Sequence, residues 1–396
     1  MTQESVVSLK KRHSKQACVS FLYTKGASTL STLAKSLRIS IPSATAIVQE
    51  LILENWIVEI GAMNSKFGRK PTLFDINPVK KTILILDIGV FQTELKKIDL
   101  RNQVTSIAQI DLLINDPDFT AKLLPWAKNQ QVLVQDVWGI GITSPGLIEK
   151  DTLANHTYVN HQASGKSLVS VLQELWNAPA FIINDTKASL LGETRFGLAR
   201  NKKNVMLLNM DWGIGLGVLS NGEILQGNNG FAGEIGHIQV IPGGELCHCG
   251  KVGCLETVAS VASLLRKAQN AIDRKTPTKL QGAPKPLTLP SIIEAAHQGD
   301  EFTIELIYEL GRELGKGLSF AVHLLNPELI LIDGLLTSVG NNLTSAIEQS
   351  LNKYCLRDFK NHLQVITSPL GETAKTLGAK HHIFEKLLHQ EFQDTL

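Results

Sequence analysis

The sequence predicts an α/β protein that consists of a small N-terminal head and a larger body. Charge is divided unevenly between them: residues 1–78 hold ten Lys/Arg and five Asp/Glu, a net charge of +5, whereas residues 79–396 hold 29 and 32, a net charge of −3. The hydrophobic pattern also changes at Pro78, from helical spacing before it to strands that alternate with helices after it. A basic segment joined to a mildly acidic body indicates a nucleic-acid-binding head.

Composition places this 396-residue chain among ordinary globular proteins, because hydrophobic residues make up 43% and charged residues 19% of it. No apolar run approaches the roughly 20 residues of a membrane-spanning helix, and the N-terminus has no apolar signal-peptide core. Five cysteines, three of them close together, do not suit a secreted disulfide framework. We therefore expect a cytoplasmic protein with no membrane partner.

The head is expected to begin with three helices. The first covers residues 14–24, and the second covers residues 29–37 with Ser28 or Thr29 as its N-cap. The third, residues 42–52, has a proline in its first turn, where the missing N–H costs nothing. Its buried stripe is Ala44, Ile47, Val48 and Leu51, and its exposed residues are Ser43, Thr45, Ala46 and Gln49.

This order of helices, with small polar residues exposed on the last, is the layout of a helix-turn-helix. Strands at 56–60 and 72–76 enclose a loop with Lys66, Arg69 and Lys70, which is typical of the basic wing of a winged helix. The candidate DNA-contacting residues are Ser43, Thr45 and Gln49 on the helix, Arg69 and Lys70 on the wing, and, for phosphate, Lys10, Lys11, Arg12 and Lys15. A three-helix protein-interaction module is the alternative.

The body is expected to be an α/β protein of two lobes. Strands are predicted within residues 81–89, 131–146, 178–193, 204–222 and 326–336. Residues 204–222 indicate a hairpin with a glycine turn, and a long helix is expected over about 302–325. The segment 274–290, rich in Pro and Lys, is expected to be a surface loop.

The most specific signal is a cluster of cysteines in the body. Cys247, Cys249 and Cys254 lie within eight residues, and His237 precedes them by ten. Three thiolates and one imidazole satisfy tetrahedral zinc without an open position, so we expect a structural zinc that fastens a glycine-rich loop. His248 competes as a ligand but is expected to point away, and a loop of free cysteines is the alternative. The remaining cysteines, expected to be buried, are Cys18 and Cys355.

Three carboxylates lie at the ends of predicted elements around this loop: Asp185, Glu234 and Glu256. Carboxylates accept paired hydrogen bonds from vicinal hydroxyl groups, so a convergent set of them suits a sugar ring. Taken singly, Asp185 could be a helix N-cap and each glutamate a solvated charge. Their clustering around one metal-fastened loop favours the sugar site.

Residues 232–240 (AGEIGHIQV) and 247–260 (CHCGKVGCLETVAS) resemble the signature of the ROK family of repressors, open reading frames and sugar kinases. The resemblance implies a winged helix-turn-helix over residues 1–78 and a two-lobed, actin-like (ribonuclease-H-like) sugar-kinase body. Its first lobe would cover 79–195 and its second 196–396, with the C-terminal helix returning to the first lobe. The resemblance implies sugar contacts from Asn184, Asp185, Glu234, His237 and Glu256, and zinc ligation by His237, Cys247, Cys249 and Cys254.

The positions that bind nucleotide in the family's kinases are altered here. Residues 87–91 read Asp-Ile-Gly-Val-Phe in place of an Asp-x-Gly-Gly-Thr turn, and residues 211–215 read Asp-Trp-Gly-Ile-Gly in place of Gly-Thr-Gly-Ile-Gly. Val90 adds a branched side chain where backbone N–H groups must approach phosphate, and Asp211 adds a negative charge. The degenerate nucleotide site retains Asp87, Gly89, Gly213 and Gly215. The body is therefore expected to bind sugar and to have lost ATP phosphotransfer.

These observations predict a sugar-responsive transcriptional regulator, a repressor of carbohydrate-metabolism genes, that acts as a homodimer or homotetramer on operator DNA. Its effector would be a sugar or sugar phosphate, and a phosphotransferase-system protein is an alternative partner. One rival is an active kinase for a hexose or N-acetylhexosamine with a fused DNA-binding head, in which Asp185 matches the family's catalytic base. The other is a metal-fastened interaction protein without a small ligand.

Overall fold

The computed structural model describes residues 6–62, 71–130, 132, 137–159, 162–163 and 165–393. Residue contacts divide the chain into two compact units. The first comprises Met1–Ser144, Thr157–Ile183 and Ala379–Leu396, and the second comprises Pro145–His156 and Asn184–Gly378. Within the described part of the chain, no helix combines the length and apolarity needed to cross a membrane.

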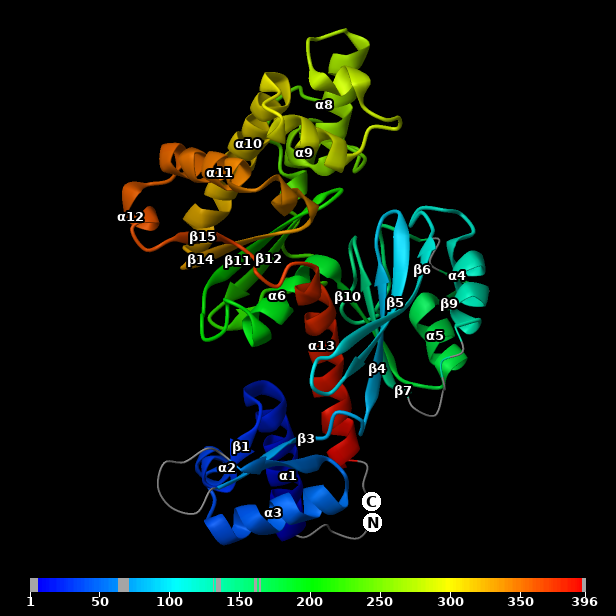
Figure 1. Cartoon of the computed structure of the whole chain (residues 1–396), viewed down its shortest axis with the longest axis vertical. Coiled ribbons are helices and arrows are strands. Elements are labelled where there is room, and N and C mark those ends of the chain that lie inside the picture. Colours follow the sequence, from blue (N-terminus) through cyan, green and yellow to red (C-terminus); the bar gives the residue numbers. More distant parts are fainter. Residues whose placement is uncertain are drawn as a thin grey trace. The chain divides into compact units, whose positions relative to one another are not determined.

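The head, in the first unit, has the predicted helices and wing strands (Figure 1). Its elements are α1 (Val6–Lys25), β1 (Ser28–Thr29), α2 (Leu30–Leu37), α3 (Ile41–Leu53), β2 (Ile57–Ala62) and β3 (Thr72–Ile76). Gly26, with φ +77°, ends α1, and the side chain of Thr29 accepts from the N–H of Thr32 to cap α2. Ser40 caps α3 in the same way, and the three strands pair in the order β1-β3-β2.

The rest of the first unit is built on a five-stranded sheet in the order β10-β7-β4-β5-β6. The strands are β4 (Thr82–Ile88), β5 (Gln92–Asp99), β6 (Val104–Asp111), β7 (Val137–Ser144) and β10 (Ala180–Asn184). The other elements are α4 (Phe119–Lys128), β8 (Gln162–Ala163), β9 (Lys166–Ser167), α5 (Leu168–Trp176) and the end of α13 (Glu372–Gln393). Helices α4 and α5 lie on one face of the sheet and α13 on the other (Figure 1).

Helix α13 packs closely on β7 because that strand presents glycines to it. A Cβ atom at Gly139 would lie 2.4 Å from a side-chain atom of Leu387, and one at Gly141 would lie 2.4 Å from Ile383. The same helix also carries aromatic contacts to the head: Tyr23 of α1 stacks on Phe384 with ring centroids 3.8 Å apart. The head therefore packs on the end of α13 within the first unit.

The second unit has its own five-stranded sheet, in the order β13-β12-β11-β14-β15. The strands are β11 (Val205–Met210), β12 (Ile214–Ser220), β13 (Glu223–Ile224), β14 (Leu329–Asp333) and β15 (Gln364–Thr367). The helices are α6 (Asp185–Phe196), α7 (Leu255–Ala259), α8 (Val261–Asp273), α9 (Leu289–His297), α10 (Glu301–Leu325), α11 (Asn341–Tyr354) and α12 (Arg357–Lys360), with the 3₁₀ helices η2 (Ile235–His237), η3 (Lys279–Gly282) and η4 (Leu335–Val339).

Both faces of this second sheet are buried, as the uninterrupted apolar character of its central strands requires. On β11, Met206 and Leu208 join the large core that contains the apolar side of α10, whereas Val205 and Leu207 face the smaller core with Leu190 of α6. The predicted hairpin at 204–222 and the long helix at 302–325 are both confirmed, as β11–β12 and α10. Cys18 and Cys355 are buried, as expected.

Candidate functional site

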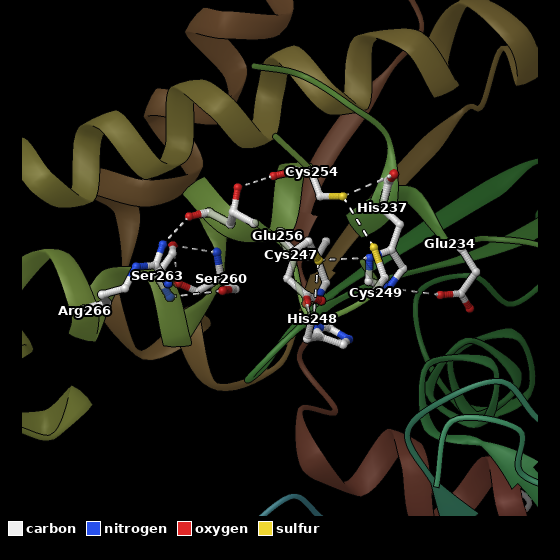
Figure 2. Close-up of polar contacts among 12 residues, drawn as sticks. Glu234, His237, Cys247, His248, Cys249, Cys254, Glu256, Ser260, Ser263 and Arg266 are labelled. Atoms are coloured by element: carbon white, nitrogen blue, oxygen red, sulfur yellow. Dashed lines mark hydrogen bonds and ion pairs between the residues drawn. The ribbon is translucent and has the colours of Figure 1, made fainter. Parts of the chain in front are cut away.

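The candidate metal ligands gather at the loop between η2 and α7 in the second unit. His237 ends η2, Cys247 and Cys249 lie on the loop, and Cys254 immediately precedes α7. One donor atom from each of these four residues lies within 4.8 Å of the others. Sγ of Cys247 is 3.6 Å from Nδ1 of His237, and Sγ of Cys249 is 3.7 Å from Sγ of Cys254 (Figure 2).

The backbone of this loop is held by short-range hydrogen bonds and by glycine. The N–H of Cys247 donates to the carbonyl of Lys251 at 2.7 Å, which closes a turn around Cys249. Gly253 has φ +74°, and a Cβ atom there would lie 1.8 Å from the carbonyl oxygen of Ile241. Only glycine fits that position, so the sequence Gly-Cys at 253–254 determines where the last thiol points.

The protonation of the thiols differs with their exposure. Burial raises the pKa of Cys254 to about 12 and also raises the pKa of Cys247. Desolvation also raises the pKa of Cys249, but hydrogen bonds, led by the one from the N–H of Lys251, together outweigh it and lower this pKa below the ordinary value. A metal would have to displace these protons, as thiol ligands generally require. Three thiols and an imidazole at this separation could bind a metal ion.

His248 does not point away from the site as expected. Its Nδ1 atom lies 2.9 Å from Oε1 of Glu256, and the carboxylate raises the pKa of His248. The other oxygen of Glu256 accepts from the backbone N–H of Ile214 at 3.1 Å. The expectation failed because the two flanking cysteines do not fix the side-chain rotation of the residue between them, and here the carboxylate of Glu256 is within reach.

The carboxylates predicted from the sequence all lie in the second unit. Asn184 caps α6, its Oδ1 accepting from the N–H of Lys187 at 3.1 Å, and its Nδ2 donates to the carbonyl of Gly146 at 3.1 Å. Asp185 follows at the start of α6, Glu234 precedes η2, and Glu256 lies in α7. The helix starts and the 3₁₀ turn therefore carry the polar groups.

The pKa of Glu234 depends on several of these groups. Its side chain keeps 40% of its surface accessible, but protein atoms crowd the carboxylate, and this desolvation raises its pKa to about 7. This pKa includes the effects of nearby charges: Lys187 lowers it, and the negative charges of Asp185 and Glu256 raise it. An accessible carboxylate with a strongly shifted pKa is typical of a binding or catalytic site. Oε2 of Glu234 is 4.0 Å from Nε2 of His237, so the carboxylate cluster adjoins the metal cluster.

Lys187 belongs to this region, and sequence reasoning missed it. Its ammonium group is buried and donates to the carbonyl of Gly230 and, at 3.4 Å, to Oε1 of Gln226. Burial lowers its pKa, and Glu234 partly offsets this effect. Its position three residues after Asn184 was the available signal, because residues i and i+3 share one face of a helix.

The altered nucleotide positions have partners within the protein. The carboxylate of Asp87 accepts from the hydroxyl of Thr143 at 2.6 Å and from Nζ of Lys96 at 3.1 Å. The N–H of Gly89 donates to the carbonyl of Gln92 at 2.9 Å, which closes the turn between β4 and β5. These groups are thus occupied by contacts within the first unit.

The second altered turn lies between β11 and β12, where Gly213 and Gly215 bracket the start of β12. Asp211 of this turn accepts, through Oδ1, from the backbone N–H of Leu335 at 2.8 Å, and its Oδ2 lies 3.3 Å from Nδ2 of Asn209. Trp212 remains 37% exposed. A carboxylate therefore binds the amide of the turn after β14, where an anion would otherwise meet a free donor.

The exposed face of α3 carries the residues predicted to contact DNA. Ser43 and Gln49 are exposed, whereas Thr45 is half-buried and its hydroxyl donates to the carbonyl of Ile41 at 2.9 Å. The N–H of Ser43 also donates to Oγ of Ser40 at 3.2 Å. The predicted wing contacts, Arg69 and Lys70, lie outside the described residues.

The basic N-terminal cluster is tied to α3. Nζ of Lys15 lies 2.9 Å from Glu50 and 2.6 Å from Glu54, and Nζ of Lys11 lies 2.6 Å from Glu50. We expected these lysines to contact phosphate. Their charges are offset by these carboxylates in this structure, and their contact with phosphate stays a prediction.

The model of the ROK family matches residues 87–385 of this chain. The DNA-binding transcriptional dual regulator NagC of Escherichia coli (strain K12) is 30% identical over 359 residues, which cover 88% of this chain and 86% of NagC. A glucokinase of Halalkalibacterium halodurans is 35% identical over 250 residues, 61% of this chain and 75% of the glucokinase.

A solved structure extends the likeness to the fold of nearly the whole chain. The crystal structure of a ROK family transcriptional regulator, a homolog of the E. coli MLC protein, superposes with a TM-score of 0.80 at 28% identity. The match covers 97% of this chain and 99% of that regulator. A ROK family glucokinase from Streptomyces griseus, 25% identical, superposes with a TM-score of 0.65 over 76% of this chain and 98% of that chain. The two matches together confirm the actin-like sugar-kinase body and the helical head predicted from the sequence.

Proposed function

Since the chain belongs to the ROK family, we propose that it is a DNA-binding transcriptional regulator whose body binds a sugar or sugar phosphate. The observation that carries this proposal is the extent of the likeness. The regulator structure matches 97% of the chain, head included, whereas the glucokinase aligns with 61% of it. The head is residues 1–78, with α3 as the helix that enters the major groove and the loop between β2 and β3 as the wing.

The sugar is proposed to contact Asn184, Asp185, Glu234, His237 and Glu256. Support comes from the second unit itself, where the charges of Asp185 and Glu256 act on Glu234 and His237 lies beside Glu234. Carboxylates that accept from neighbouring hydroxyl groups are suited to a sugar ring, and the side chain of Glu234, 40% exposed, leaves room for such contacts. We propose repression of carbohydrate-metabolism genes as the outcome, with two heads of a homodimer or homotetramer on a two-fold related operator.

Zinc is the proposed metal, held by His237, Cys247, Cys249 and Cys254. The donor set supports zinc because tetrahedral sites of three cysteines and one histidine are typical of structural zinc. Bound there, zinc would fasten the loop between η2 and α7 and orient His237 toward the carboxylates. The loop has few apolar contacts of its own: Leu246 and Val252 remain 73% and 39% exposed.

Loss of ATP phosphotransfer is part of the proposal. The carboxylate of Asp87 is already paired with Lys96, and Asp211 already occupies the backbone amide of Leu335. A nucleoside triphosphate would have to compete with both interactions, and the negative charge of Asp211 would repel its phosphates. The degenerate nucleotide positions, Asp87, Gly89, Gly213 and Gly215, are therefore proposed to serve structure and not catalysis.

The test is a thermal-shift screen of the zinc-loaded full chain. The panel holds aldohexoses, aldopentoses, N-acetylhexosamines, their 6-phosphates and ATP-Mg. We expect at least one sugar to raise Tm and ATP-Mg to leave it unchanged, since a ligand that binds only the folded state stabilises it by mass action. A chain that no sugar of the panel stabilises would contradict the proposed effector site.

The second candidate function is a sugar kinase with a fused DNA-binding head. One observation favours it: Asp185, which matches the catalytic base of the family's kinases, is retained at the start of α6 beside the cluster. This candidate predicts sugar-dependent ATP turnover that is abolished by Asp185→Asn, and stabilisation by ATP-Mg in the same screen.

A further inference from the structure

The loop that ends in Glu234 and the start of α6 carry different parts of the proposed sugar site. The loop, residues 226–234, follows β13, and α6 presents Asn184 and Asp185. Ala232 donates its N–H to the carbonyl of Gln226 at 3.1 Å, so the loop closes on itself. For Glu234 and Asp185 to contact the same ligand, the position of this loop relative to α6 has to be fixed.

Lys187 spans the two segments. Its backbone N–H donates to Oδ1 of Asn184, and its ammonium group donates to the carbonyl of Gly230 and to Oε1 of Gln226. The residue is only 6% exposed, so its contacts are shielded from water and from salt. A buried ammonium with carbonyl partners is a strong tie, and its removal leaves the carbonyl of Gly230 without that donor.

Neighbouring backbone segments approach this loop closely at two glycines. A Cβ atom at Gly230 would lie 2.8 Å from the carbonyl oxygen of Ile148, and one at Gly233 would lie 1.9 Å from that of Leu216. Both glycines have positive φ, and Glu234 follows directly. The loop therefore fits tightly between neighbouring backbones, and the side chain of Lys187 connects it to α6.

We propose that Lys187 is a positioning residue for ligand recognition, which holds Glu234 in register with Asn184 and Asp185 by tying the 226–234 loop to α6. The proposal rests on the sugar site proposed above. It also has a consequence that needs no ligand: the loop should be protected by Lys187 in the free protein.

The experiment compares three variants of the zinc-loaded full chain. Lys187→Met keeps the aliphatic stem and removes the donors, and Lys187→Arg restores donors. Lys279→Met is the matched control, because Nζ of Lys279 also donates to a backbone carbonyl, that of Gln298, on a different part of the second unit. Hydrogen exchange of residues 226–234 and calorimetric titration with the stabilising sugar of the panel are measured for each.

We expect amide exchange in the 226–234 loop to accelerate about tenfold or more in Lys187→Met, and sugar to bind this variant about tenfold or more weakly. The zinc content of Lys187→Met should be unchanged. The control, Lys279→Met, should behave like the wild type in all three measurements. Lys187→Arg should bind more tightly than Lys187→Met. Wild-type exchange and affinity in Lys187→Met would overturn the proposal, and so would an Arg variant no better than Met, because the loss would then come from packing. Faster loop exchange in Lys187→Met would show that Lys187 holds the 226–234 loop to α6. If the wild type then binds no sugar of the panel, the proposed effector site and the recognition role of Lys187 are both overturned.

Discussion

At the scale of single residues, His237 and Glu256 show that the metal cluster and the carboxylate cluster share parts. His237 contributes one ring nitrogen 3.6 Å from Cys247 and presents the other 4.0 Å from Glu234. Glu256 is held on one oxygen by Ile214 and faces His248 on the other. Loss of the metal should therefore disturb ligand recognition as well as the loop, since supporting contacts orient the groups that bind.

Cys249→Ser is predicted to remove the zinc. The Cys249 side chain is exposed, so the substitution costs little packing, and a hydroxyl group is a poor zinc ligand. We expect zinc to fall from about one per chain to well below that. Tm should fall by about 5 °C if roughly 2 kcal/mol is lost, and a chelator should give the wild type the same Tm. Metal analysis and thermal unfolding measure this.

The matched control is Cys355→Ser, the same substitution at a cysteine outside the cluster. It should keep the full zinc content. Equal zinc in Cys249→Ser and the wild type would refute the assignment of Cys249 as a ligand.

At the scale of elements, helices α6 and α13 approach each other through glycine. A Cβ atom at Gly378 would lie 1.8 Å from the carbonyl oxygen of Ala188, and one at Gly192 would lie 2.0 Å from that of Ala374. These obstacles are backbone atoms, which cannot rotate away as a side chain can. The glycines thus set the distance between the helix that carries Asp185 and the beginning of α13.

Gly378→Ala is predicted to destabilise the protein by about 1–3 kcal/mol, although alanine favours a helix by about 1 kcal/mol, because the methyl group forces the two helices apart. Denaturant unfolding measures the change. Gly282→Ala serves as the control: a Cβ atom at Gly282 meets nothing within 4 Å, so this variant should unfold like the wild type or be slightly more stable. Equal stability of the two variants would contradict the close packing of α6 and α13.

At the scale of the whole molecule, the proposed ligand residues lie in one unit and the head in the other. Helix α13 is common to both: its beginning packs on α6, and its end packs on Tyr23 of the head. A sugar can alter DNA affinity only if it prefers one of at least two conformations of the chain. We expect the carboxylate cluster and the loop around it to give the sugar its higher affinity for one of these conformations.

The double variant Arg69→Ala/Lys70→Ala is predicted to bind the DNA upstream of its own gene about tenfold or more weakly than the wild type does. Each lost phosphate contact should also reduce the slope of log affinity against log salt by about 1. Titrations at several salt concentrations measure both effects. Lys25→Ala, which removes a head cation at the end of α1, should leave affinity and slope nearly unchanged. A double variant with the wild-type salt dependence would contradict the winged-helix assignment.

The sequence by itself determined the helix-turn-helix order, the buried stripe of α3, the alternation of strands and helices and the cysteine spacing. These features depend on local periodicity, on caps such as Thr29 and on turn residues such as Gly26, all of which act over a few residues. Only the tertiary structure showed that Lys187 reaches Gly230, that His248 turns to Glu256 and that Asp211 occupies the amide of Leu335. Such contacts join segments up to 124 residues apart, and they depend on how whole elements pack, which no local pattern records.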